Sequence, residues 1–458
     1  MTSQKHIIII GAGISGLSLA WKLCAKGFKI DLFESQSIVG GLASTRRKDH
    51  YSMDFGPHSF FSDDSEILAT ILDIFNENLL SRPRKVKFYY KKIYLNYPLT
   101  VYNILFRMGM ASGIKAFFSF LKSKVISKKI KYVIGEEETV EDWAINNFGN
   151  HLYQIFFKPY TEQFWKIPCN KLSSKTIPTH TRLSFINTFR LLLHCPSTAT
   201  DASLIEREML PTYYPKTGFG EIPEKIAILI QKRGVRVHLN CNVTKLSNIF
   251  DKNLHVEYKE NGQKKTIKGT KIISTIPINR LVKMLRPTPP LTILEAADKI
   301  NYKPLLVLGM VTDKQNILGC NYIYVLDRPY TRISELNKFS SKTSPFDENI
   351  LTVEIPCTRD SAAWTATKED LFKMCIESLT KDGFLTPTDV KKLLLIKAPY
   401  AYPIYHKNYA VNLQKLVEYI KQHDGIEILG RNGEFSYMDI DRCIRRAFDL
   451  AEKLTNYL

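Results

Sequence analysis

The stretch that decides the fold is Ile7-Ile8-Ile9-Ile10-Gly11-Ala12-Gly13-Ile14-Ser15-Gly16, near the start of the chain. Four consecutive isoleucines predict a buried strand, and the apolar residues after the glycines have the spacing of a helix packed on a sheet. Gly11 allows a tight turn, Gly13 lets the backbone approach a pyrophosphate, and Gly16 brings the helix close to its strand. The phosphates of a ligand would then lie at the helix N-terminus, where unpaired N–H groups favour negative charge.

A second predicted strand, Lys29–Phe33, ends at Glu34, about 20 residues beyond the glycines. A carboxylate at this place can accept hydrogen bonds from both hydroxyls of an adenosine ribose. A glycine turn alone could be a simple turn in an α/β core. The strand, the glycines, the helix, the second strand and the terminal acid follow in order, and together they indicate a dinucleotide-binding unit.

Length and composition indicate a globular protein of about two or three intertwined domains. The chain has 458 residues, of which 44% are hydrophobic and 24% charged, as is ordinary for a folded protein. The 64 Lys and Arg residues outnumber the 45 Asp and Glu residues, which gives a net charge of +19. Such a charge attracts nucleotide phosphates, anionic lipid headgroups or nucleic acid, although it can also serve only solubility.

The eight cysteines are scattered singly, without the spacing of a zinc site, so we expect no metal and a reduced, cytoplasmic compartment. The apolar N-terminal stretch carries the glycine turn and lacks a signal-peptide cleavage site. No run of apolar residues is long enough for a membrane span.

The segment after Glu34 carries a family resemblance. Gly40-Gly41-Leu42 comes shortly after the acid, and Asp54-Phe55-Gly56-Pro57-His58 opens a turn. With the first strand and its glycines, these residues resemble the start of the flavoenzyme superfamily that includes protoporphyrinogen oxidases, flavin amine oxidases and UDP-galactopyranose mutases. The resemblance implies that the dinucleotide is FAD, that the glycine pair approaches it, and that Gly56-Pro57-His58 lies near the flavin ring.

The end of the chain resembles the mutases in particular. Gly430-Arg431-Asn432-Gly433-Glu434-Phe435-Ser436-Tyr437-Met438-Asp439-Ile440 is similar to their ending G-R-x-G-x-Y-x-Y-x-D-M. The resemblance implies that Arg431 lies beside the flavin, that Tyr437 bonds the substrate diphosphate, and that Asp439 contacts the cofactor. Ile440 replaces the methionine. No cysteine occurs in this turn, so we expect FAD to be bound noncovalently.

The middle of the chain resembles these families less closely. Tyr97 lies in a segment similar to one that enters their substrate domain, and Trp165 falls on the tryptophan of the mutase element Y-T-x-K-x-W. Gln163 stands where that element has lysine. Lys303 stands at the arginine of the mutase element Y-R-x-L, which contacts the substrate diphosphate in that family; lysine keeps the charge but loses the bidentate fork.

Three further charged residues are candidates for substrate binding, but each could instead have a purely structural role. Arg182, in a Ser-, Thr- and Pro-rich stretch, could clamp a diphosphate, but most such arginines are solvated. Arg332 and Glu354 lie near predicted strands, and the alternative to substrate binding is a structural ion pair.

Chain order predicts an α/β fold with two domains. A discontinuous Rossmann-like FAD-binding domain would comprise residues 1–85, 215–298 and 399–458. An inserted α+β substrate-binding domain of helices plus a mixed sheet would comprise residues 86–214 and 299–398.

The predicted site residues fall into three groups. His58, Arg431 and Tyr437 are the catalytic candidates. Cofactor contacts are expected from Gly11, Gly13, Ser15, Gly16, Glu34, Gly40, Gly41, Leu42, Gly56, Pro57, His58, Val243, Thr275, Gly430, Arg431, Asp439 and Ile440. Substrate contacts are expected from Tyr97, Tyr160, Trp165, Arg182, Lys303, Arg332, Tyr402 and Tyr437.

The resemblance implies one of two reactions on a small-molecule substrate. A mutase uses reduced flavin to isomerise a nucleotide sugar without net redox change, and the C-terminal motif favours this reaction. An oxidase or desaturase uses oxidised flavin to take hydride from an apolar or amine substrate, and Lys303 and the aromatic-rich segments favour that one. The substrate, and the reductant or electron acceptor, are not defined by the sequence.

Two further partners are considered. The Phe-rich, basic stretch from Leu105 to Lys131 could make peripheral contact with an anionic membrane, although a core-facing helix with a basic end is the favoured interpretation. A nucleic-acid-binding protein is the most distant alternative, because only the net charge supports it, and we expect no nucleic acid partner.

Overall fold

The computed structural model describes residues 5–76, 78–90, 92–96, 110–127, 137–177, 210–250 and 253–457. Two of the predicted substrate contacts, Tyr97 and Arg182, lie outside the described residues.

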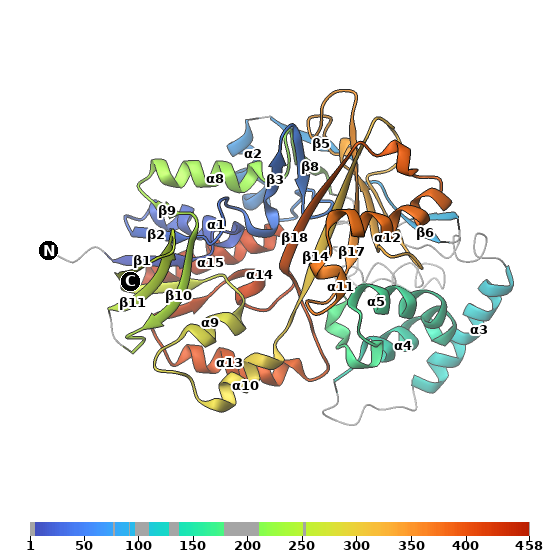
Figure 1. Ribbon diagram of the computed structural model, residues 1–458. Helices are drawn as coiled ribbons and strands as arrows, with labels where there is room; N and C mark the ends of the chain where they lie inside the picture. Colours follow the sequence, from blue (N-terminus) through green and yellow to red (C-terminus); the bar gives the residue numbers. More distant parts are fainter. Residues whose placement is uncertain are drawn as a thin grey trace.

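The molecule has two halves in space, each drawn from several parts of the chain. The first half, on the left of Figure 1, has a five-stranded parallel sheet at its centre. Its strands run in the order β19 (Ile426–Ile428), β13 (Lys271–Ser274), β1 (His6–Ile10), β2 (Lys29–Phe33) and β9 (Arg236–His238). All neighbouring pairs are parallel, so the carboxyl ends of the strands meet at one edge. The chain therefore has the predicted α/β fold, with the isoleucine strand in the middle of its sheet.

Strand β1 has isoleucine at four consecutive positions, instead of alternating apolar and polar residues, because both faces of the sheet are covered. Ile7 and Ile9 pack in a core with helices α1 (Ile14–Cys24), α8 (Glu221–Lys232) and α15 (Ile440–Tyr457). Ile8 and Ile10 pack in a second core on the opposite face. That core is completed by α9 (Ile278–Met284), α10 (Leu291–Lys299), α13 (Tyr409–Lys421) and an antiparallel sheet of β10 (Cys241–Ser247), β11 (Leu254–Glu260) and β12 (Gln263–Gly269).

Segments from the two ends of the chain meet at this sheet. Helix α1 packs against α15, where the rings of Trp21 and Phe448 meet edge to face with centroids 6.2 Å apart. At Gly430, the first residue of the short helix α14 (Gly430–Gly433), an added Cβ would lie 2.3 Å from Ser15 Oγ. The close approach of these segments therefore depends on a glycine.

The second half of the molecule is built on a seven-stranded mixed sheet (Figure 1). Its pairs are antiparallel except for the parallel pair of β15 and β6. The strand order is β18 (Lys392–Pro403), β14 (Tyr302–Thr312), β17 (Asn349–Pro356), β16 (Arg332–Glu335), β15 (Tyr322–Val325), β6 (Val86–Tyr90) and β7 (Ile93–Asn96). Strand β18 runs across residue 399, where we placed a domain boundary.

Helices cover this sheet and extend one side of it. Helix α12 (Lys368–Lys381), which begins with a capping box at Thr367, packs on one face, and α11 (Ala362–Thr365) precedes it. The helices α3 (Met110–Ser127), α4 (Val140–Leu152) and α5 (Lys158–Trp165) gather at the lower right of Figure 1, with a π-helical turn between α4 and α5.

The Phe-rich helix α3 faces the core on one side only. Ala116 and Phe120 are buried, whereas Ile114, Phe117, Phe118 and Leu121 are exposed. The core-facing interpretation is therefore wrong for most of its described large apolar side chains. No helix within the described ranges is both long and apolar enough to cross a bilayer.

Short elements connect the two halves. The hairpin of β3 (Thr45–Lys48) and β4 (Tyr51–Asp54) leads to α2 (Ser65–Phe75). Strand β5 (Leu79–Arg82) then pairs with β8 (Thr212–Pro215), where the chain re-enters the first half.

Candidate functional site

A cavity of about 760 Å³ opens at the carboxyl edge of the parallel sheet. Gly11, Glu34 and Thr275, which directly follow β1, β2 and β13, line it. The cavity continues between the two halves of the molecule, where residues of the seven-stranded sheet and of α5 form its wall. A crevice at the carboxyl ends of parallel strands is the usual ligand site of such sheets.

The structure brings most of the described predicted residues to this cavity. Its wall includes the cofactor candidates Gly11, Gly13, Ser15, Glu34, Gly40, Gly41, Leu42, Pro57, His58, Thr275, Arg431, Asp439 and Ile440. It also includes the substrate candidates Tyr160, Trp165, Arg332, Tyr402 and Tyr437. Gly16, Gly56, Val243, Gly430 and Lys303 do not line it.

The first glycine turn forms a cradle made of backbone. Gly11 has φ +103°, and its N–H donates to Phe33 O at 2.8 Å, which ties the turn to β2. A Cβ on Gly16 would lie 2.1 Å from Gly11 O, so the helix can approach the strand only without a side chain there. A Cβ on Gly13 would meet no protein atom within 4 Å, because this glycine borders the cavity. The N-terminus of α1 is thus open to a phosphate group.

The second glycine pair is joined to the first. Gly40 N–H donates to Ala12 O at 2.8 Å, and Gly13 and Gly40 form a parallel bridge. Gly40 has φ +106°, and a Cβ on it would lie 2.8 Å from Pro223. The two turns therefore form one continuous backbone wall, which explains why glycine recurs.

Glu34 is buried at the cavity edge and held by local hydrogen bonds. Its Oε2 accepts from Ala12 N–H at 3.0 Å, and its Oε1 accepts from Gln36 N–H at 2.9 Å. Oε1 also accepts from the Ser35 hydroxyl at 3.2 Å, so Oε2 is the oxygen that keeps a further lone pair. This orientation suits the ribose hydroxyls for which the residue was predicted.

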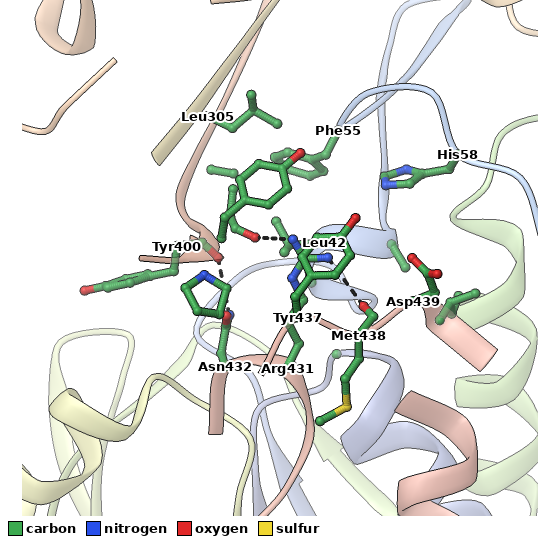
Figure 2. Close-up of a pocket in the computed structure, with 18 of the residues that line it drawn as sticks. Leu42, Phe55, His58, Leu305, Tyr400, Arg431, Asn432, Tyr437, Met438 and Asp439 are labelled. Carbon is green, nitrogen blue, oxygen red and sulfur yellow. Dashed lines mark hydrogen bonds between the residues drawn. The ribbon is translucent and has the colours of Figure 1, made fainter. Parts of the chain in front are cut away.

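Arg431 lies at the other end of the cavity, against two tyrosine rings (Figure 2). Its guanidinium carbon is 4.4 Å from the ring centroid of Tyr437 and 4.9 Å from that of Tyr402. The guanidinium donates to Ala401 O at 2.7 Å and to Met438 O at 3.4 Å. Its buried Nε has no protein partner. These contacts fix a positive charge at the cavity wall.

His58 faces the same end of the cavity and stacks on Phe219, with ring centroids 5.1 Å apart. Burial, reinforced by the charges of Arg332 and Arg431, lowers its pKa to about 3. The imidazole is therefore neutral at physiological pH, and its buried Nδ1 has no protein partner. His58 can exchange hydrogen bonds with a ligand but carries no charge there.

Arg332 and Glu354 form a buried ion pair in the cavity wall. The guanidinium binds Glu354 Oε1 at 2.6 Å, which confirms the ion-pair interpretation of these residues. Burial raises the pKa of the Glu354 carboxyl, and Arg332 opposes that shift. Glu354 is only 2% exposed, and its Oε2 has no protein partner. One carboxylate oxygen thus remains available to a ligand.

Gly56 makes room for this ion pair rather than lining the cavity. It has φ +105°, and an added Cβ would lie 2.5 Å from Glu354 Oε1. Val243 is buried in the core on the β10–β12 side of the parallel sheet, so the structure does not bring its side chain to the cavity.

The two departures from the mutase motifs both have structural partners. Lys303 is 1% exposed, and its Nζ donates to Cys357 O at 3.1 Å; burial lowers its pKa to about 8. Gln163 donates to Arg328 O at 2.7 Å and to Tyr330 O at 3.0 Å, and thereby holds a turn. Neither side chain lines the cavity.

Sequence reasoning missed several wall residues that belong to no recognised motif. They are Arg84, Arg280, Tyr322, Tyr324, Lys397 and Tyr400. The only signal of these residues in the sequence was the high aromatic content of some of their segments.

The donor groups fit FAD rather than a metal. The open glycine cradle accepts a pyrophosphate, the carboxylate of Glu34 accepts a ribose, and unpartnered polar atoms of His58 and Arg431 remain at the far end. Within the described ranges, no group of three or more His, Cys, Asp or Glu side chains is arranged to hold a metal ion. The seven described cysteines are free.

Comparison with known proteins agrees with this geometry. The chain matches the family of flavin-containing amine oxidoreductases over residues 14–409. A protein named as a UDP-galactopyranose mutase of Klebsiella pneumoniae is 25% identical over 185 residues, which cover 38% of this chain and 44% of that relative. The chloroplastic protoporphyrinogen oxidase of Nicotiana tabacum is 21% identical over an alignment that covers 100% of this chain and 86% of the relative. The mutase match thus spans less than half of that relative.

Among solved structures, a reduced UDP-galactopyranose mutase superposes with a TM-score of 0.79 and 17% sequence identity, over 99% of this chain and 94% of that one. This likeness establishes the fold.

Proposed function

The chain belongs to the family of flavin-containing amine oxidoreductases, and from this premise we propose that it is a FAD-dependent enzyme that isomerises an anionic, nucleotide-sugar-type substrate in the manner of a mutase. One observation carries the proposal. The end of the cavity opposite Glu34 combines the guanidinium groups of Arg431 and Arg332 with the tyrosines Tyr402 and Tyr437. Cations and hydroxyls in one enclosed space suit a hydroxylated, anionic ligand.

FAD, when bound, supplies the electron-donating or electron-accepting centre of the reaction. In this proposal it is held noncovalently, with its pyrophosphate at the N-terminus of α1 beside Gly13 and its ribose on Glu34. With FAD bound, Arg431 would stabilise negative charge on the ring, because a fixed cation in a water-poor site acts strongly on nearby charge.

The substrate is oriented by groups that the protein leaves unpartnered. Oε2 of Glu354 accepts a hydrogen bond from a substrate hydroxyl, while Arg332 keeps the carboxylate in place. His58 offers a neutral ring nitrogen and does not act as an acid at neutral pH, since its pKa lies near 3. The protein thus positions the substrate and leaves the difficult step to the cofactor.

An oxidase or desaturase of an apolar or amine substrate is the second candidate. It is favoured by the absence of Lys303 and Gln163 from the cavity wall, since these positions carry the cations of the mutase motifs. It is also favoured by the many rings in that wall, among them Phe61, Phe88, Phe156, Phe157 and Phe164.

One experiment separates the two reactions. The purified flavoprotein is photoreduced without oxygen and supplied with UDP-sugars, and in parallel the oxidised protein is supplied with amines and porphyrinogens. Interconversion of sugar isomers by the reduced protein alone supports the mutase. Bleaching of the oxidised flavin by a substrate, with peroxide on re-aeration, refutes it in favour of the oxidase.

Peripheral contact with an anionic membrane is also part of the proposal. The exposed apolar residues of α3, Ile114, Phe117, Phe118 and Leu121, lie beside the exposed Lys115 and Lys122. Such a face suits insertion at a lipid surface with basic groups on the headgroups. Sedimentation with anionic but not with zwitterionic vesicles is expected, and Phe117→Ser/Phe118→Ser should abolish it.

A further inference from the structure

Two arginines contact one tyrosine ring at the cavity, a lysine lies three residues before that tyrosine, and the mechanism above uses none of these cations. This cationic rim consists of Arg280 at the start of α9, Lys397 and Tyr400 in β18, and Arg359 in the loop after β17. Arg280, Lys397 and Tyr400 line the cavity. Figure 2 shows Tyr400 on the opposite side of Arg431 from His58. The rim therefore borders the cavity and is made by both halves of the molecule.

The rim is held together by stacking and by backbone carbonyls. The guanidinium carbon of Arg359 lies 4.1 Å from the ring centroid of Tyr400, and that of Arg280 lies 5.7 Å from it. Arg359 also donates to Pro399 O at 2.6 Å, and Lys397 donates to Trp364 O at 2.6 Å. These contacts orient the cations but do not neutralise them.

No acidic side chain of the described residues forms an ion pair with Arg280, Arg359 or Lys397. The neighbouring Asp360 is exposed, and its hydrogen bond with Thr358 lowers its pKa. By contrast, Lys283 of the same helix as Arg280 is paired with Asp298. Like charges repel at short range, so a cluster without a counter-charge favours binding of an anion.

The rim is coupled to the turn that carries Arg431. Asn432 Nδ2 donates to Tyr400 O at 3.3 Å, and the buried Asn432 Oδ1 has no protein partner. An anion on the rim would thus lie close to the proposed flavin end of the cavity. A polyphosphate can engage several guanidinium groups at once, since each offers a planar fork of donors.

We propose that the cationic rim binds the diphosphate of a nucleotide ligand. This inference rests on the proposed function, and it assigns the diphosphate to Arg280, Arg359 and Lys397 instead of to Lys303, which is buried against Cys357. The Tyr400 ring positions both guanidinium groups, which offer their remaining N–H donors to phosphate oxygens.

Equilibrium binding to the FAD-loaded protein tests the rim. Calorimetric titrations with UDP, inorganic pyrophosphate and uridine are made on the wild type, Arg280→Gln and Arg359→Gln. Each substitution should weaken UDP and pyrophosphate at least about tenfold and leave uridine unchanged, because a charge-assisted contact is lost. Arg233→Gln, at an exposed arginine after α8, is the matched control and should bind like the wild type.

The outcomes separate this inference from the proposed function. If the wild type binds UDP and both rim variants bind it equally well, the rim does not bind the diphosphate and this inference is refuted. The nucleotide-sugar proposal then stands. If pyrophosphate binding depends on the rim but UDP adds no affinity over it, the rim stands and the proposed function fails. If the variants lose FAD and, once reloaded, bind UDP normally, the rim serves the cofactor and the inference is overturned.

Discussion

The cofactor end and the substrate end of the cavity are built in different ways. At the cofactor end, the wall includes backbone from glycine turns that come after strands, as at Gly11, Gly13 and Gly40. At the substrate end, the wall is made of long side chains from segments far apart in the chain, such as Tyr160, Arg332 and Tyr402. The first end follows from local sequence, whereas the second requires the whole fold.

This difference explains why the glycine motifs predicted the positions of their residues correctly, whereas the cation positions of the mutase motifs did not. A glycine turn acts through backbone atoms, whose positions are fixed by the strand before it. A long cation can choose among several partners, so the same place in a motif does not guarantee the same role. Lys303 and Gln163 occupy cation positions of a mutase motif, yet both bind carbonyl groups of the protein.

The largest effect is expected at the cofactor end. Gly16→Val would place atoms against Gly11 O, where even a Cβ would lie at 2.1 Å, so α1 must move away from β1. We expect complete loss of FAD, measured by flavin absorbance, and a lower melting temperature of the apoprotein. Gly13→Ala is the control: its Cβ meets no protein atom, so the apoprotein should melt normally while FAD binds more weakly. Normal FAD content in Gly16→Val would contradict the backbone cradle.

The next effect is expected where the two ends meet. Arg431→Ala removes the charge held by Ala401 O and Met438 O, and turnover should fall by about 10²–10³-fold. Folding and FAD content should stay close to wild type, and the flavin reduction potential should become more negative. Arg431→Lys, which keeps the charge, should recover part of the potential. Wild-type turnover in the alanine variant would remove Arg431 from the mechanism.

A smaller effect, on stability alone, is expected within the scaffold of the cofactor end. Asp31 is fully buried in β2 and bound by His6, His238 and Arg236. Burial alone would raise its pKa, but the hydrogen bonds from these partners hold the pKa well below its usual range. Asp31→Asn should lower the free energy of unfolding at pH 7 by about 3 kcal/mol.

The pH dependence of this loss has a definite sign. A carboxylate whose pKa is lower in the folded state stabilises the protein above its unfolded pKa of about 4 and loses that effect as the pH falls. The gap between wild type and Asp31→Asn, measured by urea unfolding, should therefore shrink below about pH 4. Asp298→Asn, which breaks an exposed pair with Lys283, is the control and should cost under about 0.5 kcal/mol. A gap that grows on acidification would be inconsistent with an ionised Asp31.

The smallest effect is expected at the substrate end, at the motif position that the structure buries. Lys303→Met should change UDP affinity by less than about twofold, because its ammonium group contacts Cys357 O and not the cavity. Arg280→Gln, in the cationic rim, is the comparison in the same titration. A tenfold loss of UDP affinity in Lys303→Met would instead indicate that Lys303 contacts the diphosphate, as the mutase motif implies.

The order of the elements could be predicted well from the sequence. The isoleucine strand β1, the helix α1 after the glycines, the strand β2 (Lys29–Phe33) and the mixed sheet all appear as expected, because apolar runs and helical periodicity indicate burial on one or two faces. The outward apolar face of α3 could not be predicted, since periodicity shows that a stripe exists but not whether another element covers it.

The sequence by itself determined the glycine cradle and Glu34 and, through the residues after Gly430, the meeting of the two chain ends. These features are backbone turns at strand ends and need only local geometry. Only the tertiary structure decided that Arg332 and Glu354 share one buried pair, that Gly56 makes room for it, and that Lys303 is buried against Cys357 O. Those roles depend on which side chains meet across the fold, and distance in space between such residues is not encoded in their spacing along the chain.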